Sequence, residues 1–170
     1  MARRFPWLKY LAGIALFAFW HQLYDLFPGT WAAILAEGER ESIFAHMKML
    51  FYPYLILSVA DYILLRRKGR VSASLLYARL LILSSAPWLM ISTWYVPDAL
   101  GIVMEGAIEL IYSILFSFVG VYLAIRMEEP LEATHYRLAL KLLLWAAFLA
   151  ALITYTGFSL HLPHYGFFVI

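Results

Sequence analysis

The chain has 170 residues, the length of one domain, but its composition differs from that of soluble domains. Hydrophobic residues make up 64% and charged residues 14%, compared with roughly 45–50% and about 25% in soluble globular proteins. A chain of this size cannot bury so much apolar surface in its own core, so it needs lipid or a very large partner. The composition and the formal net charge of only +2 exclude a soluble enzyme and a nucleic-acid-binding module. They predict a single integral membrane domain over residues 1–170.

Taken in chain order, five apolar segments are long enough to cross a bilayer. We expect spans over residues 7–27, 44–65, 75–95, 100–125 and 138–158. Each has about 20 residues, and at ~1.5 Å per residue such a helix covers the ~30 Å hydrocarbon core. None alternates apolar and polar residues as the strands of a membrane barrel do. The prediction is therefore an all-α integral membrane protein, a bundle of five transmembrane helices.

The basic residues predict how this bundle is oriented. All but Arg40 and Lys48 of the 13 Lys and Arg residues lie at the N-terminus or beside the loops that follow the second and fourth segments. Lys and Arg are enriched in the cytoplasmic loops of membrane proteins. We therefore expect a cytoplasmic N-terminus, a C-terminus outside, and residence in the plasma (inner) membrane.

Four of the five histidines and most of the carboxylates at membrane depth are predicted to lie in the outer half. His21 and Asp25 are one helical turn apart near the end of the first segment, and Glu105 and Glu109 are one turn apart in the fourth. At ~1.5 Å per residue, Glu109 is predicted close to the membrane midplane. An ionised carboxylate at span depth costs at least ~2.5–3.5 kcal/mol, so these acids need partners, protonation or water.

Glu109 also belongs to a stripe of small or hydroxylated residues with helical spacing. The other members are Gly106, Ser113, Ser117 and Gly120. Small residues are typical of helix–helix contacts in membranes, so we expect this stripe to face protein. Lys48, near the start of the second segment, is the predicted cationic partner of Glu109.

Three interpretations of the outer polar residues stay open. They form a protonatable or ligand-binding pocket, they hold a divalent metal such as zinc, or they are a structural network of ion pairs. The candidate pocket residues are Glu41, His46, Lys48, Glu105 and Glu109. The candidate metal ligands are His21, His46, Glu105, Glu109 and His161. The sharpest form of the prediction is that His46 and Glu109 line one cavity open to the outer face.

The segment 41–53 resembles a motif of one family of small, uncharacterised prokaryotic multi-pass membrane proteins. The family pattern is Asn-Glu-Ser-x-Trp-Glu-His-x-Lys, followed by an apolar run and a proline. The matching residues are Glu41, Ser42, His46, Lys48 and Pro53. The departures are Arg40, Phe44 and Ala45, which stand in place of Asn, Trp and Glu. The resemblance implies a multi-pass fold and marks this segment, but it implies no activity.

Two classes of function follow from these observations. The first is a membrane protein whose outward-facing His/Glu/Lys pocket binds a small ligand, a proton or a divalent metal. The alternative is a structural or accessory subunit of a larger membrane complex, without chemistry of its own. The expected partners are the lipid bilayer and either other membrane subunits or further copies of the chain, with no nucleic acid. No catalytic triad order, phosphate-binding loop or haem motif indicates an enzyme.

Overall fold

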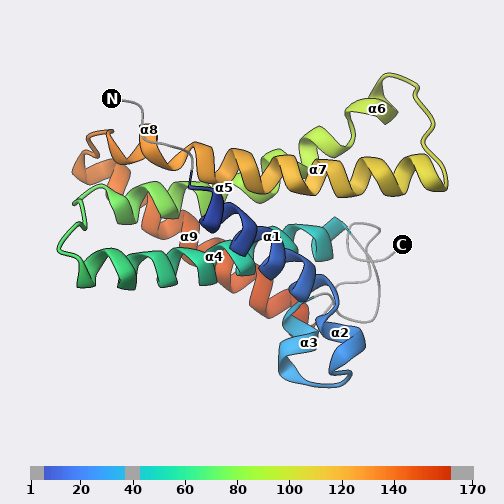
Figure 1. Ribbon diagram of the computed structural model, residues 1–170, viewed down its shortest axis with the longest axis horizontal. Helices are drawn as coiled ribbons and strands as arrows, with labels where there is room; N and C mark the ends of the chain where they lie inside the picture. The colour runs from blue at the N-terminus through green and yellow to red at the C-terminus, as the bar shows by residue number, and fades with distance from the viewer. Residues whose placement is uncertain (1–5, 37–42, 162–170) are drawn as a thin grey trace.

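The computed structural model describes residues 6–36 and 43–161, and within these ranges the chain is helical and has no β-strand. The long helices of this part of the chain are α1 (Trp7–His21), α4 (Ile43–Arg67), α5 (Leu75–Trp94), α7 (Ala107–Arg126) and α9 (Leu138–Leu160). Short helices connect them: α2 (Leu23–Leu26), α3 (Trp31–Ala36), α6 (Val96–Ala99) and α8 (Glu128–Glu132). Successive long helices run in opposite directions, so the bundle has two ends (Figure 1).

Among the described residues, four stretches are long and apolar enough to cross a membrane. They are α4, α5, α7 continued through α8, and α9. By contrast, α1 has 15 residues, or about 22 Å of helix, which is shorter than the ~30 Å hydrocarbon core. The predicted all-α class and the presence of membrane-capable helices are confirmed. Four of the five predicted spans thus correspond to helices that are long and apolar enough to cross a membrane.

The predicted boundaries are accurate for three segments and wrong for two. The first span was predicted to end at residue 27, but α1 ends at His21. α4, α5 and α9 agree with the predicted segments to within two residues. α7, however, begins at Ala107 rather than at residue 100. Gly101 and Gly106 have φ angles of 72° and 58°, a region that suits glycine and interrupts a helix. Three of the four intervening residues are apolar, so hydropathy alone extended the predicted helix through a loop.

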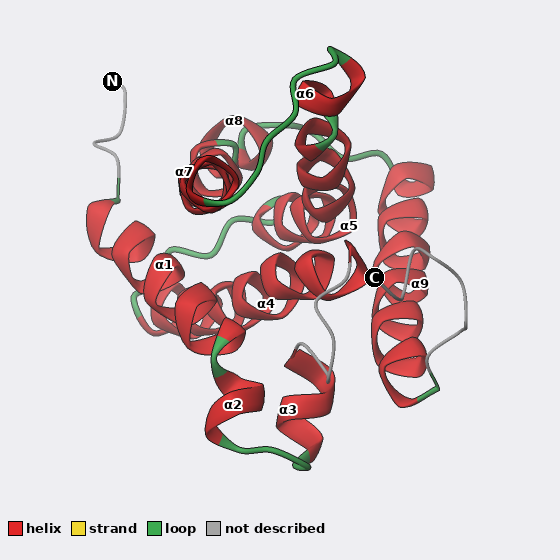
Figure 2. Cartoon of the chain, turned by 90° about the vertical axis from the view of Figure 1, so that its right-hand side faces the viewer, coloured by secondary structure: helices red, strands yellow, loops and turns green. Residues whose placement is uncertain are grey.

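α4 is the central helix of the bundle, and α1, α3 and α5 all pack on it (Figure 2). Its Phe51 is fully buried and packs on Tyr155 of α9, with ring centroids 4.7 Å apart. α7 and α9 lie at the periphery and expose large aliphatic side chains, among them Leu115 and Ile153. Such faces are suited to lipid, because lipid tails are as apolar as these side chains.

Candidate functional site

A cavity of about 470 Å³ lies at the end of the bundle where α1 and α5 end and α4 and α7 begin. We call it the His46 cavity. Its polar lining is His21, His46, Glu109, Ser113 and Ser117. Its aromatic lining is Trp94, Tyr95 and Phe116. The volume falls within the ~300–1,000 Å³ range of sites that bind small molecules.

Each ionisable group of the His46 cavity comes from the end of a different helix. His21 is the last residue of α1, His46 lies in the first turn of α4, and Glu109 lies in the first turn of α7. The imidazole of His46 stacks on the indole of Trp94, with centroids 6.4 Å apart and 23° between the planes. Phe116 packs edge-on against the same indole at 5.6 Å. One wall of the cavity is therefore aromatic, and the ionisable groups converge from three helices.

Within the described part of the chain, no hydrogen bond or ion pair holds the Glu109 carboxylate. Its residue is exposed at the cavity, whereas His21 and His46 are half-buried. Solvent can reach the carboxylate, which relieves the cost of leaving it without a counter-charge. The Glu109 carboxylate gives the cavity lining an acidic group without a counter-charge among the described residues, and the cavity thus favours a cation over an anion.

Lys48 lies on another side of α4. Its Nζ donates hydrogen bonds to Ser159 Oγ of α9 at 2.9 Å and to the Ile34 carbonyl of α3 at 3.3 Å. Two residues along a helix turn the side chain by about 200°, so Lys48 and His46 face in different directions. The predicted pairing of Lys48 with Glu109 is wrong for this reason, and Lys48 does not line the cavity.

The remaining candidate residues are dispersed. Glu105 lies in the exposed loop before α7 and His161 is exposed at the C-terminal end of α9, and neither lines the His46 cavity. Glu41 lies outside the described residues. Over the described ranges, no three His, Asp or Glu side chains are grouped closely enough to hold a metal ion. The candidate zinc ligands are thus reduced to His21, His46 and Glu109 around one cavity, without the three-ligand geometry that zinc requires.

The depth predicted for Glu109 is also wrong. Because α7 begins at Ala107, Glu109 occupies its first turn and not the middle of a span. The predicted stripe faces protein only in part. Ser113 and Ser117 line the cavity, and a Cβ on Gly120 would lie 3.4 Å from Met90 Sδ of α5, an ordinary contact distance. Gly106 is exposed and a Cβ there would meet nothing within 4 Å, so the N-terminal end of the stripe does not pack on another helix.

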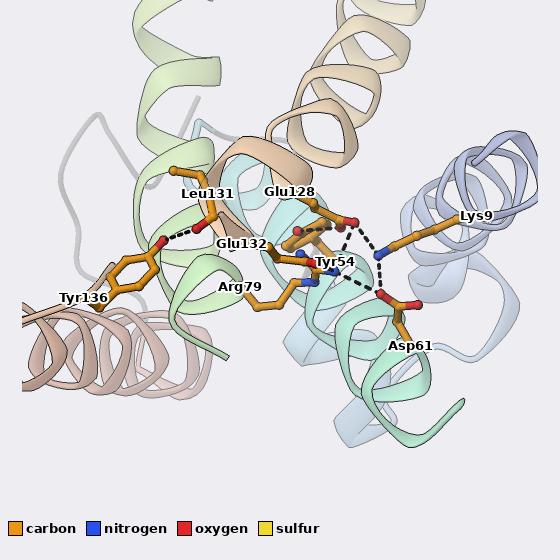
Figure 3. A network of polar contacts seen from close by, with 8 residues as sticks. All are labelled: Lys9, Tyr54, Asp61, Arg79, Glu128, Leu131, Glu132 and Tyr136. Atoms are coloured by element: carbon orange, nitrogen blue, oxygen red, sulfur yellow. Dashed lines mark hydrogen bonds and ion pairs between the residues drawn. The ribbon is translucent and has the colours of Figure 1, made fainter. Parts of the chain in front are cut away.

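The opposite end of the bundle contains a second polar site, which we call the polar cluster (Figure 3). Its members are Lys9, Tyr54, Asp61, Arg79, Glu128 and Glu132. Lys9 Nζ lies 2.6 Å from both Asp61 Oδ2 and Glu128 Oε2. These contacts connect α1 to α4 and α8.

Arg79 of α5 is the hub of the polar cluster. Its Nη2 lies 3.0 Å from Asp61, 3.1 Å from Glu128 and 2.7 Å from Glu132. The hydroxyl of Tyr54 donates to Glu128 Oε1 at 2.8 Å. Arg79 and Glu128 are only 4% and 6% exposed. The cluster is a buried network in which cations and carboxylates of four helices pair with one another.

One side of the guanidinium remains unsatisfied by protein. Nε and Nη1 of Arg79 are buried and have no hydrogen-bond partner among the described atoms. A cavity of about 290 Å³ borders Lys9, Arg79 and Glu128. This space is polar and large enough for water molecules, which would complete the hydrogen bonds of the cluster.

The polar cluster was not predicted from the sequence, because Lys9 and Arg79 also fit the rule that enriches basic residues at the cytoplasmic side. The signal that could have found it is Asp61, a carboxylate inside the second predicted span. Charged residues within membrane segments face the bundle interior or water, and pair with one another or with backbone carbonyls. Asp61 therefore required cations at the same depth, and Lys9 and Arg79 lie at that end of neighbouring helices.

Comparison with known proteins gives no relative: no family model, curated protein or solved structure matches this chain. The function must therefore be inferred from its own residues.

Proposed function

We propose that the chain crosses the plasma membrane five times, with α1 as the first span, the N-terminus in the cytoplasm and the C-terminus outside. α1 packs on α4 and α7, and Lys9 ties it into the polar cluster. The connection between α4 and α5 contains Lys68 and Arg70, as expected for a cytoplasmic loop. In this orientation the polar cluster lies on the cytoplasmic side and the His46 cavity on the outer side.

We further propose that the His46 cavity binds a small ligand with a positive charge. The observation that carries this proposal is the Glu109 carboxylate, which faces a cavity of about 470 Å³ and has no counter-charge within the described part of the chain. The rings of Trp94 and Phe116 line the same cavity, and aromatic rings attract cations. A carboxylate beside aromatic rings is a chemistry suited to a protonated or quaternary amine.

The test is the binding of tetramethylammonium to the purified protein in lipid nanodiscs, measured by isothermal titration calorimetry. Glu109→Gln keeps the shape of the side chain and removes its charge, and we expect at least a tenfold weaker affinity, equivalent to about 1.4 kcal/mol. Glu105→Gln is the matched control, because Glu105 is a nearby exposed carboxylate outside the cavity. Equal affinities of all three proteins, or no binding to the wild type, would contradict the proposal.

The second candidate is a structural or accessory subunit, related to the multi-pass family that segment 41–53 resembles. The observation favouring it is the polar cluster, which joins four helices internally and whose charges are already paired. Purification in a mild detergent distinguishes the two candidates. A stoichiometric partner subunit, together with no cation binding, supports the accessory function.

A further inference from the structure

A second hollow lies beside the His46 cavity, along the face between α5 and α7. It has a volume of about 410 Å³, and we call it the α5–α7 groove. Met90 and Phe116 line both spaces, so the two are adjacent. The groove is lined almost entirely by apolar side chains, such as Leu81, Val119 and Leu123. A cavity with ionisable groups therefore lies next to an apolar trough.

The groove has the direction and the length of a lipid chain. α5 and α7 run antiparallel along the bundle (Figure 1). On α5 the lining extends from Leu81 to Thr93, which at ~1.5 Å per residue is about 18 Å. One leaflet of a ~30 Å hydrocarbon core is about 15 Å deep. A single extended chain in one leaflet thus matches the trough.

The groove is also open on its lipid-facing side. Leu89, Val119 and Leu123 form part of its lining and are 64%, 52% and 52% exposed. A molecule dissolved in the bilayer can enter the trough sideways, without any movement of the helices. Its polar end would then meet the His46 cavity, where Glu109 and the aromatic wall lie.

We propose that the ligand of the His46 cavity is a cationic amphiphile with a long alkyl chain. The charged head lies beside Glu109, and the chain lies in the α5–α7 groove. This inference rests on the proposed function and names the class of ligand. A chain that leaves bulk lipid gains little from another apolar surface. Selectivity therefore comes from the head, and the groove fixes the position and length of the chain.

The experiment compares tetradecyltrimethylammonium with tetramethylammonium, two probes that share the same head. Both are titrated into wild-type protein and variants in nanodiscs, with the partition of the long probe into empty nanodiscs subtracted. Gly120→Leu places an alkyl side chain in the groove, since a Cβ at this position meets only Met90 at ordinary contact distance. Gly157→Leu is the matched control, because a Cβ there has nothing within 4 Å.

We expect Gly120→Leu to weaken binding of the long probe at least fivefold, and to change that of tetramethylammonium less than twofold. Glu109→Gln should weaken both probes, and Gly157→Leu neither. Unchanged binding of the long probe to Gly120→Leu would overturn the proposal that the ligand is an amphiphile. It would leave the proposed cation site intact. Failure of the wild type to bind either probe would instead remove the proposed function itself.

A series of chain lengths on the wild-type protein tests the same inference without a variant. Affinity, corrected for partition, should rise with chain length until the groove is filled and then level off. Affinity independent of chain length would overturn the inference. Equal binding of tetradecyl sulfate would overturn the proposal that the head of the ligand is cationic. A polypeptide crosslinked in the groove would show that a protein partner occupies it, and would overturn the amphiphile proposal.

Discussion

The two ends of the bundle treat charge in opposite ways. In the polar cluster, Arg79 and Lys9 contact three carboxylates from other helices, and Arg79 and Glu128 are buried. At the His46 cavity, Glu109 is exposed and has no such counter-charge in the described residues. Buried charge needs partners inside the protein, whereas charge at an open cavity remains available to a ligand. The difference distinguishes a site that holds the bundle together from one that can recognise another molecule.

The largest effect is expected for Arg79→Met. The cluster contains two cations and three carboxylates, and this change leaves three carboxylates with Lys9 alone. Removing one partner from a buried network costs about 3–5 kcal/mol. We expect a loss of this size in the free energy of unfolding, measured in mixed micelles. Arg126→Met is the control: its guanidinium is half-exposed and lies 4.0 Å from Glu129, so about 0–1 kcal/mol is expected. Similar losses for both variants would contradict the importance given to burial.

A smaller effect is expected for Glu128→Gln, compared with the same change at Glu109. Neutralising Glu128 leaves two cations facing Asp61 and Glu132, so formal charges balance, but the amide has one acceptor oxygen where the carboxylate accepts from both Lys9 and Tyr54. We expect a loss of about 1.5–3 kcal/mol in the free energy of unfolding. Glu109→Gln should change it by less than about 0.5 kcal/mol. A reversal of this order would show that Glu109 is the structural residue.

A still smaller loss is expected for Tyr54→Phe. The change removes one donor to the buried Glu128 carboxylate while leaving its two cations in place, and we expect about 1–2 kcal/mol. Tyr10→Phe is the control, since its hydroxyl makes an exposed contact of 3.4 Å to a carbonyl oxygen and not to a buried carboxylate. If chemical denaturation gives equal stabilities for both variants, the hydroxyl of Tyr54 does not support the cluster.

Much of the fold follows from hydropathy, because burial in lipid imposes long apolar runs that charged loops terminate. The boundaries of α4, α5 and α9 were predictable for this reason. The start of α7 was not, since the positive φ angles of Gly101 and Gly106 interrupt a segment that is mostly apolar. His46 and Glu109 were predicted to share a cavity, and they line the same one.

The partners of the charged residues could not be predicted in the same way. Lys48 and Glu109 looked complementary in sequence, but helix rotation turns Lys48 toward Ser159. Lys9 and Arg79 fit a rule about loops, which concealed their role as partners of Asp61. Pairing depends on the face and depth of each side chain in the assembled bundle, and a one-dimensional pattern contains neither.

The last and smallest expected effect is the coupling between the two ends. Arg79 is the fifth residue of α5, and Trp94, on the wall of the His46 cavity, is its last. The helical separation is about 22 Å, and mutations at distant sites without shared partners add to within about 0.3–0.5 kcal/mol. A double-mutant cycle of Arg79→Lys and Glu109→Gln, with unfolding and tetramethylammonium affinity as readouts, should therefore give a coupling energy within that limit. Arg79→Lys keeps the charge, so that enough folded protein remains to measure binding. A coupling above about 1 kcal/mol would mean that the polar cluster biases the ligand site through the helices between them, and the two ends would then be parts of one mechanism.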